Sequence, residues 1–467
     1  MTDPRQQSQP PGAAGTFAVP AAVTQGLETQ EALARTGPSA FSRSEVEDIH
    51  QLLPYLSYSD GELTVEAIPA TDLWDGSRPM LLYLPRRAVD NYRSIHAAFA
   101  QYFDVSVCCA VKTCYVSGML SALRAAGAGA EIASDFEWRI VRRTGFSPER
   151  TVANGVARAA RHLESLLTEE TNLIGIDGGE ELERIESDAR RLGVKPQIMI
   201  RVNPLPPDAF FSERSKLGTD WDTAYQLLER AAGSPHLDLR GVHAHQLVRS
   251  ADPEQFGRLA GRMGELASAF ATASGTRLKM LDLGGGLESR FLLERAGQPI
   301  GEFAAAARDA LAGGPRGFHL MLEPGRYIFG DAALVLTGVL GTRRKGGASW
   351  LITEIGCNIL PPTSDRAYPP LPLRLTAGQD WQRRHVADPT PAPSRLYLDA
   401  LLPEDTAEHG LALIGCGAYT AVRASVWGTD LPDIALLSQG RAEIVFGRSG
   451  QDAAVRYMYG VDLDGMD

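Results

Sequence analysis

Residues 105–134 read VSVCCAVKTCYVSGMLSALRAAGAGAEIAS, and their pattern decides the fold. A short apolar run, 105–111, is followed by a stretch with apolar residues at helical spacing and then by a second apolar run, 130–134. Neither run alternates polar with apolar residues, which is typical of parallel strands buried on both faces. The stretch therefore predicts a strand, a helix and a second strand parallel to the first.

The same unit recurs through the middle of the chain. Eight apolar runs, separated by segments with helical spacing, are VSVCCAV (105–111), AEIAS (130–134), TVAN (151–154), LIGID (173–177), QIMIRV (197–202), LRGVHAH (239–245), MLDLGGG (280–286) and HLMLEP (319–324). Eight such repeats predict an α/β fold with a parallel sheet closed into a (β/α)8 barrel of the TIM type. An open doubly wound sheet is the competing architecture, and the number of strands favours the barrel.

The flanking sequence indicates a second domain that is mostly β. Apolar pieces separated by Gly and Pro turns follow the barrel segment, and residues 377–394 are expected to be a long loop between strands. In chain order, the expected parts are a disordered tail (1–40), an N-terminal segment of the β domain (41–80), the barrel (81–335) and the C-terminal β domain (336–467).

Composition excludes several classes of function. The 46 basic and 57 acidic residues give a net charge of −11, so no basic field favours nucleic acid or an anionic membrane. The five cysteines include no CxxC spacing, which argues against a disulfide framework or a structural zinc site. No run of 18 apolar residues and no secretory leader are found, so we expect a cytoplasmic protein.

Polar residues that end the apolar runs are the candidates for chemistry, because barrel active sites lie at the carboxyl ends of the strands. Lys112 is either a solvated lysine or an amine shielded from water at the open end of the barrel. In the second case desolvation would lower its pKa and favour a Schiff base. Residues 284–286, all glycine, and Arg326 follow the seventh and eighth runs, where barrels commonly bind phosphate.

A glutamate, Glu323, and two histidines, His243 and His245, also lie near the carboxyl ends of apolar runs. Glu323 needs a cationic partner, which is either a neighbouring arginine or a protonated pyridine nitrogen. His243 and His245 point to the same side of one strand. No carboxylate or cysteine cluster accompanies them in the sequence, so we expect no metal.

Seven motifs in this order resemble those of the fold-type III pyridoxal-phosphate decarboxylases, the ornithine, diaminopimelate and arginine decarboxylase family with an alanine-racemase-like barrel. The resemblance extends from about residue 61 to about residue 462. The motifs are AVKTCY (110–115), EIASDFE (131–137), IRVNP (200–204), SKLG (215–218), LDLGGG (281–286), EPGR (323–326) and GCGAYT (415–420).

The resemblance implies pyridoxal 5'-phosphate as cofactor and assigns roles by motif. Lys112 would carry the cofactor, Glu323 would pair with the ring nitrogen, and His245 would stack on the ring. The implied phosphate side comprises Gly284, Gly285, Gly286, Gly325, Arg326 and Tyr419. The family also implies a homodimer whose sites are completed by the partner subunit.

The chain departs from the family pattern at three places. Val248 stands where a phosphate-binding serine is expected, which removes a hydrogen bond worth roughly 1.5 to 3 kcal/mol. Tyr397, with Asp399 nearby, takes the place of a cysteine that helps protonate the carbanion in the partner's site, and we expect Tyr397 to be the proton donor. The segment 354–371 lacks an arginine found in diaminopimelate decarboxylases, although Arg366 lies close enough to compensate.

These departures argue against diaminopimelate as the substrate. Arg201, Arg366 and Asp399 are the candidate substrate contacts. We expect an α-decarboxylase of an amino acid or amino-acid conjugate, in siderophore or other secondary metabolism. Two alternatives stay open: a racemase, epimerase or eliminating enzyme that uses the same cofactor, and a catalytically silent subunit that binds it.

Overall fold

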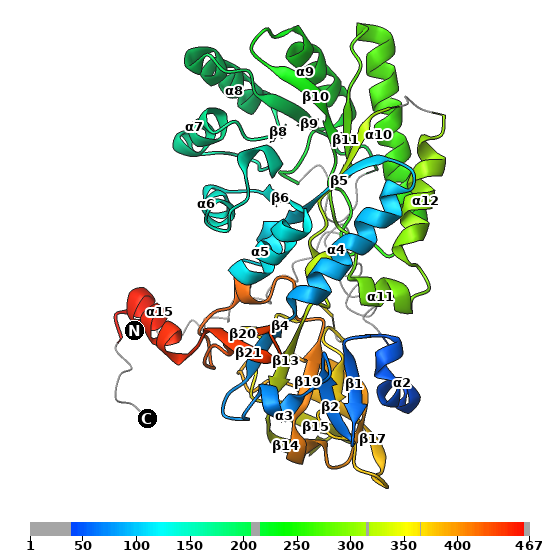
Figure 1. Cartoon of the computed structure of the whole chain (residues 1–467), viewed down its shortest axis with the longest axis vertical. Coiled ribbons are helices and arrows are strands. Elements are labelled where there is room, and N and C mark those ends of the chain that lie inside the picture. Colours follow the sequence, from blue (N-terminus) through cyan, green and yellow to red (C-terminus); the bar gives the residue numbers. More distant parts are fainter. Residues whose placement is uncertain (1–38, 207–214, 314–316, 365, 462–467) are drawn as a thin grey trace, which may run out of the picture.

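The computed structural model describes residues 39–206, 215–313, 317–364 and 366–461. A barrel and a β-rich domain lie one above the other (Figure 1). The expected tail, residues 1–40, falls almost entirely outside the described residues. No helix in the described ranges is both long and apolar enough to cross a membrane.

The eight apolar runs form one closed parallel barrel, which confirms the predicted fold and excludes the open sheet. The last strand pairs with the first, His319 opposite Asp104, so no edge is left open. The barrel strands are β5 (Asp104–Ala110), β6 (Gly129–Ile132), β7 (Thr151–Ala153), β8 (Leu173–Ile176), β9 (Gln197–Arg201), β10 (Asp238–His243), β11 (Met280–Asp282) and β12 (His319–Leu322).

Helices cover the outside of the barrel (Figure 1). They are α4 (Pro85–Ala100), α5 (Ser117–Ala126), α6 (Asp135–Arg143), α7 (Ala160–Thr168), α8 (Gly179–Leu192), α9 (Trp221–Gly233), α10 (Pro253–Ser274), α11 (Arg290–Arg295) and α12 (Ile300–Leu311). Helix α10 shows why they begin and end where they do. Asp252 accepts hydrogen bonds from the first free backbone N–H groups, and Gly275 ends the helix in the left-handed conformation.

A six-stranded sheet forms the centre of the second domain. Its order is β16 (Pro370–Pro372), β19 (Leu411–Ile414), β13 (Ala333–Thr337), β4 (Met80–Tyr83), β20 (Asp433–Ser438) and β21 (Arg441–Phe446). Strands β4 and β13 pair with each other here, although residues 81–83 and 333–335 of these strands fall within the expected barrel segment 81–335. They are as apolar as the barrel strands, so their composition could not separate them from the barrel.

Two smaller sheets complete this domain. One contains β1 (Leu56–Ser59), β2 (Glu62–Val65) and β3 (Ile68–Pro69), and the other contains β14 (Val339–Lys345), β15 (Ala348–Thr353), β17 (Trp381–Ala387) and β18 (Tyr397–Pro403). The prediction of one long loop over 377–394 is wrong, because β17 lies inside it. A buried arginine, Arg384, occupies a core-facing position of β17 and hides its alternation.

The two domains meet at the carboxyl ends of the barrel strands. The backbone N–H of Tyr419, in the loop after β19, donates to the carbonyl of Thr113 at 2.9 Å. That loop is therefore seated on the segment that follows β5, beside Lys112.

Candidate active site

Lys112 lies in η2 (Val111–Thr113), the short 3-10 turn directly after β5. Its Nζ is 2.5 Å from Oε2 of Glu131, a buried residue of β6. Burial would lower the pKa of Lys112, but the charges of Glu131 and Glu323 outweigh it and raise the pKa above the ordinary value. Of the two interpretations of Lys112, the one in which desolvation lowers its pKa is therefore wrong.

Three buried carboxyl groups lie close to one another, and two of them, Glu131 and Glu323, are beside Lys112. Glu131, Asp282 and Glu323 end or lie within neighbouring strands, and each is at most 1% exposed. The side-chain amide of Asn154 donates to Glu323 Oε1 at 2.6 Å and to Glu131 Oε1 at 3.4 Å. This amide therefore fixes the spacing of two of the three acids.

The pKa values of Glu323 and Asp282 shift in opposite directions. Burial would raise the pKa of Glu323, but His243 and Lys112 hold it below its usual range. Burial and the charge of Glu323 raise the pKa of Asp282 well above its usual range. Of the two, Glu323 is therefore the group that favours the ionised form.

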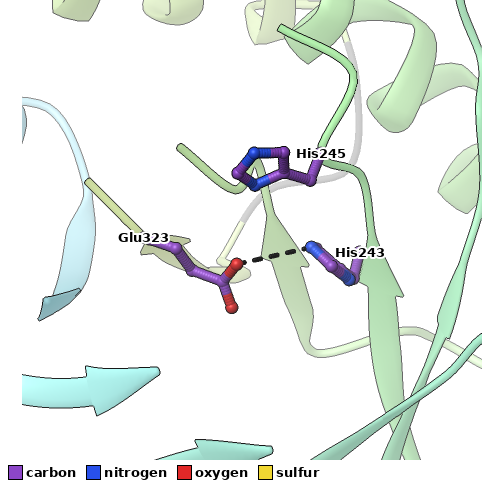
Figure 2. A group of neighbouring side chains, drawn as sticks. All are labelled: His243, His245 and Glu323. Atoms are coloured by element: carbon purple, nitrogen blue, oxygen red, sulfur yellow. Dashed lines mark ion pairs between the residues drawn. The ribbon is translucent and has the colours of Figure 1, made fainter. Parts of the chain in front are cut away.

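His243, His245 and Glu323 bring one ligand atom each to within 4.8 Å of one another. Figure 2 shows a ring nitrogen of His243 directed at the Glu323 carboxylate, and His243 Nε2 lies 3.5 Å from Glu323 Oε2. These groups have the composition of a metal-ligand set, so the absence of a metal stays a prediction.

His245 is held in its neutral form. Its Nδ1 accepts a hydrogen bond from the backbone N–H of Gly285 at 3.2 Å, so a proton on the neutral ring is at Nε2. Burial, followed by the charges of Lys112 and Arg201, lowers the pKa of His245 to about 3. Arg201 is itself buried at the end of β9, 3.5 Å from the carboxylate of Asp177.

The glycines after β11 form a loop that no other residue fits. A Cβ at Gly285 would lie 2.2 Å from the carbonyl oxygen of Glu323, and one at Gly286 would lie 2.0 Å from that of Leu247. Gly284 and Gly286 also have positive φ angles. Bare backbone in this position allows the close approach that phosphate oxygens need.

Arg326 stands beside this loop at the start of α13 (Arg326–Phe329). Its guanidinium lies 5.4 Å from the ring centroid of Tyr419, the β-domain residue next to Lys112. A Cβ at Gly325 would lie 2.3 Å from the Thr113 side chain, so this glycine keeps the Arg326 segment close to the lysine segment. The expected phosphate residues are therefore brought together.

Tyr397, Arg366 and Asp399 lie elsewhere. Tyr397 is 1% exposed on β18, and burial raises its pKa to about 12. Its enclosure within its own chain argues against the prediction that it donates a proton in a partner's site. Asp399 pairs with Arg366 at 3.5 Å and with His385 at 3.6 Å, within the β domain.

Sequence reasoning missed three members of the site, Glu131, Asn154 and Asp282. The signal was present, because each is a polar residue within or at the end of an apolar run. Such residues are costly in a strand buried on both faces unless they are paired.

Comparison with known proteins decides the family. The family described as "Pyridoxal-dependent decarboxylase, pyridoxal binding domain" matches residues 88–330. The chain belongs to the pyridoxal-dependent decarboxylases. Diaminopimelate decarboxylase of Aquifex aeolicus is 28% identical over 379 residues, 78% of this chain and 88% of that protein. The enzyme of the same name from Pseudomonas aeruginosa is 30% identical over 354 residues, 73% of this chain and 80% of that protein.

The fold agrees with this decarboxylase family. The crystal structure of the M. jannaschii diaminopimelate decarboxylase in complex with L-lysine superposes with a TM-score of 0.74 at 18% identity, covering 85% of this chain and 97% of that one. The predicted family and cofactor are confirmed.

The site fits pyridoxal phosphate. An ionised Glu323 with no hydrogen-bond partner on Oε2 within the described residues suits a protonated ring nitrogen, and the glycine loop suits the phosphate. Lys112, Glu323, His245, the three glycines, Arg326 and Tyr419 would hold the cofactor. When bound, it supplies the sink for the electron pair released from Cα. Glu323 would stabilise the charge of a protonated ring nitrogen, while the neutral His245 would add no competing charge.

Proposed function

We propose that this decarboxylase removes the α-carboxylate of an amino acid or amino-acid conjugate other than diaminopimelate, in a specialised biosynthetic pathway. The assembly of Lys112, ionised Glu323 and the glycine loop supports the α-decarboxylation. The choice of substrate rests on the segment 354–371, which lacks the arginine expected for diaminopimelate.

The position of Arg366 supports this choice. Arg366 is the arginine near enough in the sequence to compensate, but its guanidinium lies 3.5 Å from the Asp399 carboxylate. This ion pair neutralises the positive charge of Arg366, to which a distal carboxylate of the substrate would otherwise bind. Diaminopimelate is the second candidate, favoured by the names of the relatives.

The test is release of CO2 from a panel containing diaminopimelate, lysine, ornithine, arginine and their N-acyl derivatives. We expect another amino acid to exceed diaminopimelate in kcat/KM by about tenfold or more, equivalent to 1.4 kcal/mol. The Lys112→Ala variant is the control for background. Diaminopimelate as the best substrate would overturn the choice of substrate, and Cα–H exchange in deuterated water without CO2 would overturn decarboxylation.

We also propose that the enzyme is a homodimer with shared sites. Arg366 and Asp399, with 33% and 43% of their side chains exposed, are available on one chain to meet a partner. The family resemblance supports this assembly.

A further inference from the structure

A buried acid stands next to the glycine loop. Glu288 is 6% exposed and follows Gly286 by two residues. Its Oε1 accepts the backbone N–H of Ser289 at 2.8 Å and lies 3.7 Å from Nε of Arg326. A carboxylate here repels a phosphate and competes with it for the charge of Arg326.

Arg249 meets the other oxygen of this acid. Its Nε donates to Glu288 Oε2 at 2.7 Å, and its Nη1 donates to the hydroxyl of Thr363 at 2.8 Å. The guanidinium is thus held by the barrel on one side and by the segment after β15 on the other.

The backbone ties Arg249 to the glycine loop. The N–H of Ser250 donates to the carbonyl of Gly286 at 2.8 Å, and the N–H of Glu288 donates to the carbonyl of Ser250 at 3.0 Å. Arg249 itself has φ +50°, a left-handed conformation that costs a side-chain-bearing residue of order 1 to 3 kcal/mol. Its position is therefore set by the same backbone that forms the glycine loop.

The charges explain what this arrangement does. Without Arg249, the charges of Glu288 and Arg326 would cancel each other. Mainly backbone N–H groups would then remain to bind the phosphate. With Arg249 present, two guanidinium groups share one carboxylate, and a net positive charge remains. Burial would raise the pKa of Glu288, but Arg326 and Arg249 outweigh it and lower the pKa, so the acid stays ionised between them.

We propose that Arg249 is a positioning residue of the phosphate site, which neutralises Glu288 and leaves Arg326 free to bind the cofactor phosphate. Arg249 directly follows Val248, the position at which the phosphate-binding serine is missing. The inference concerns binding of the cofactor and does not depend on which amino acid is the substrate.

The test measures binding of pyridoxal phosphate and of pyridoxal, which lacks the phosphate, to the cofactor-free protein. For Arg249→Met we expect the Kd of pyridoxal phosphate to rise about tenfold or more, while the Kd of pyridoxal stays within about threefold of the wild-type value. Arg249→Lys keeps the charge and is expected to lose less. Arg258→Met removes an exposed arginine of α10 and is the matched control. Equal losses for both ligands, or no loss for either, would overturn the proposal.

A double variant separates neutralisation from direct contact. If Arg249 acts through Glu288, Arg249→Met combined with Glu288→Gln removes the need for compensation. The Kd of pyridoxal phosphate then returns to within about threefold of the wild-type value. A double variant that binds as weakly as Arg249→Met alone would show that Arg249 does not act through Glu288.

Discussion

At the mouth of the barrel Lys112 lies beside Glu131 and Glu323, and Asp282 is a third buried carboxyl group next to Glu323. The charges of His243 and Lys112 lower the pKa of Glu323, whereas burial and the charge of Glu323 raise the pKa of Asp282. Glu131 forms the short ion pair with the lysine. This distribution of charge keeps the Lys112 amine protonated. It also keeps the Glu323 carboxylate ionised, as pairing with a protonated ring nitrogen would require.

Substitution Glu131→Gln tests the first of these charges. The charge of Glu131 raises the pKa of Lys112, so its removal should lower that pKa. Attachment of pyridoxal phosphate requires the neutral amine, and the pH profile of the attachment rate should therefore move toward lower pH. Stopped-flow absorbance measures the profile, with the exposed Glu164→Gln as control. An unmoved profile would contradict the assignment.

Glu323→Gln and Asp282→Asn form a matched pair of amides. The first removes a negative charge and should lower kcat about 100-fold, or about 2.7 kcal/mol of barrier. The second replaces a group whose raised pKa favours the neutral form, so kcat should change by less than about tenfold. Steady-state kinetics with the identified substrate measures both. The reverse order of effects would show that Asp282, not Glu323, carries the charge.

Some residues of the site could be predicted from the sequence and others could not. Lys112 and Glu323 end their apolar runs, which made them recognisable. Glu131 lies inside its run, and only the closed barrel brings it to the lysine. The role expected of Tyr397 rests on its match to the cysteine position of the family, and the sequence carries no sign that β18 buries it.

Among the elements, the turn after β11 is tightly constrained. The glycine loop passes so close to the carbonyl oxygens of Glu323 and Leu247 that a Cβ would overlap them. Backbone cannot move aside as a side chain can, so a substitution must displace the loop itself. The phosphate site therefore depends on bare backbone at these positions.

Gly285→Ala tests this requirement. The added Cβ should displace the loop and weaken pyridoxal phosphate binding by about tenfold or more, while pyridoxal binding changes less. Gly301→Ala in α12 is the control, because nothing lies within 4 Å of its Cβ position, and in a helix it should stabilise the fold by about 0.5 to 1 kcal/mol. Spectroscopic titration and thermal unfolding measure the two effects. Unchanged phosphate-dependent binding in Gly285→Ala would contradict the role of the loop.

The elements themselves were largely predictable. Eight buried parallel strands are mostly apolar, and their repetition indicates the barrel. Strand β17 was missed because Arg384 occupies a buried position, where its guanidinium donates to the carbonyl of Glu404 at 2.8 Å. The pattern of polar and apolar residues in the sequence cannot show that a backbone carbonyl accepts a hydrogen bond from such a buried arginine.

At the scale of the whole molecule, the site lies where two domains meet. The barrel supplies Lys112, Glu323 and the glycine loop, and the β domain supplies Tyr419 and the partner of Arg249, Thr363. The sequence indicates both domains, but it does not show that β4 pairs with β13 in the second sheet. In the proposed dimer, a second chain would also contribute residues to each site.

Dilution tests the proposed dimer. If each site is completed by the partner subunit, specific activity should fall as the protein is diluted below its dimer dissociation constant. Analytical ultracentrifugation over the same concentrations should show dimers becoming monomers in parallel. Full activity of monomers would contradict shared sites.

Reductive trapping tests the central assignment most directly. Borohydride treatment of the protein with pyridoxal phosphate, followed by peptide mapping, should place a single reduced adduct on Lys112, and Lys112→Ala should give none. An adduct on another lysine, or no adduct in the wild-type protein, would contradict the account of this site.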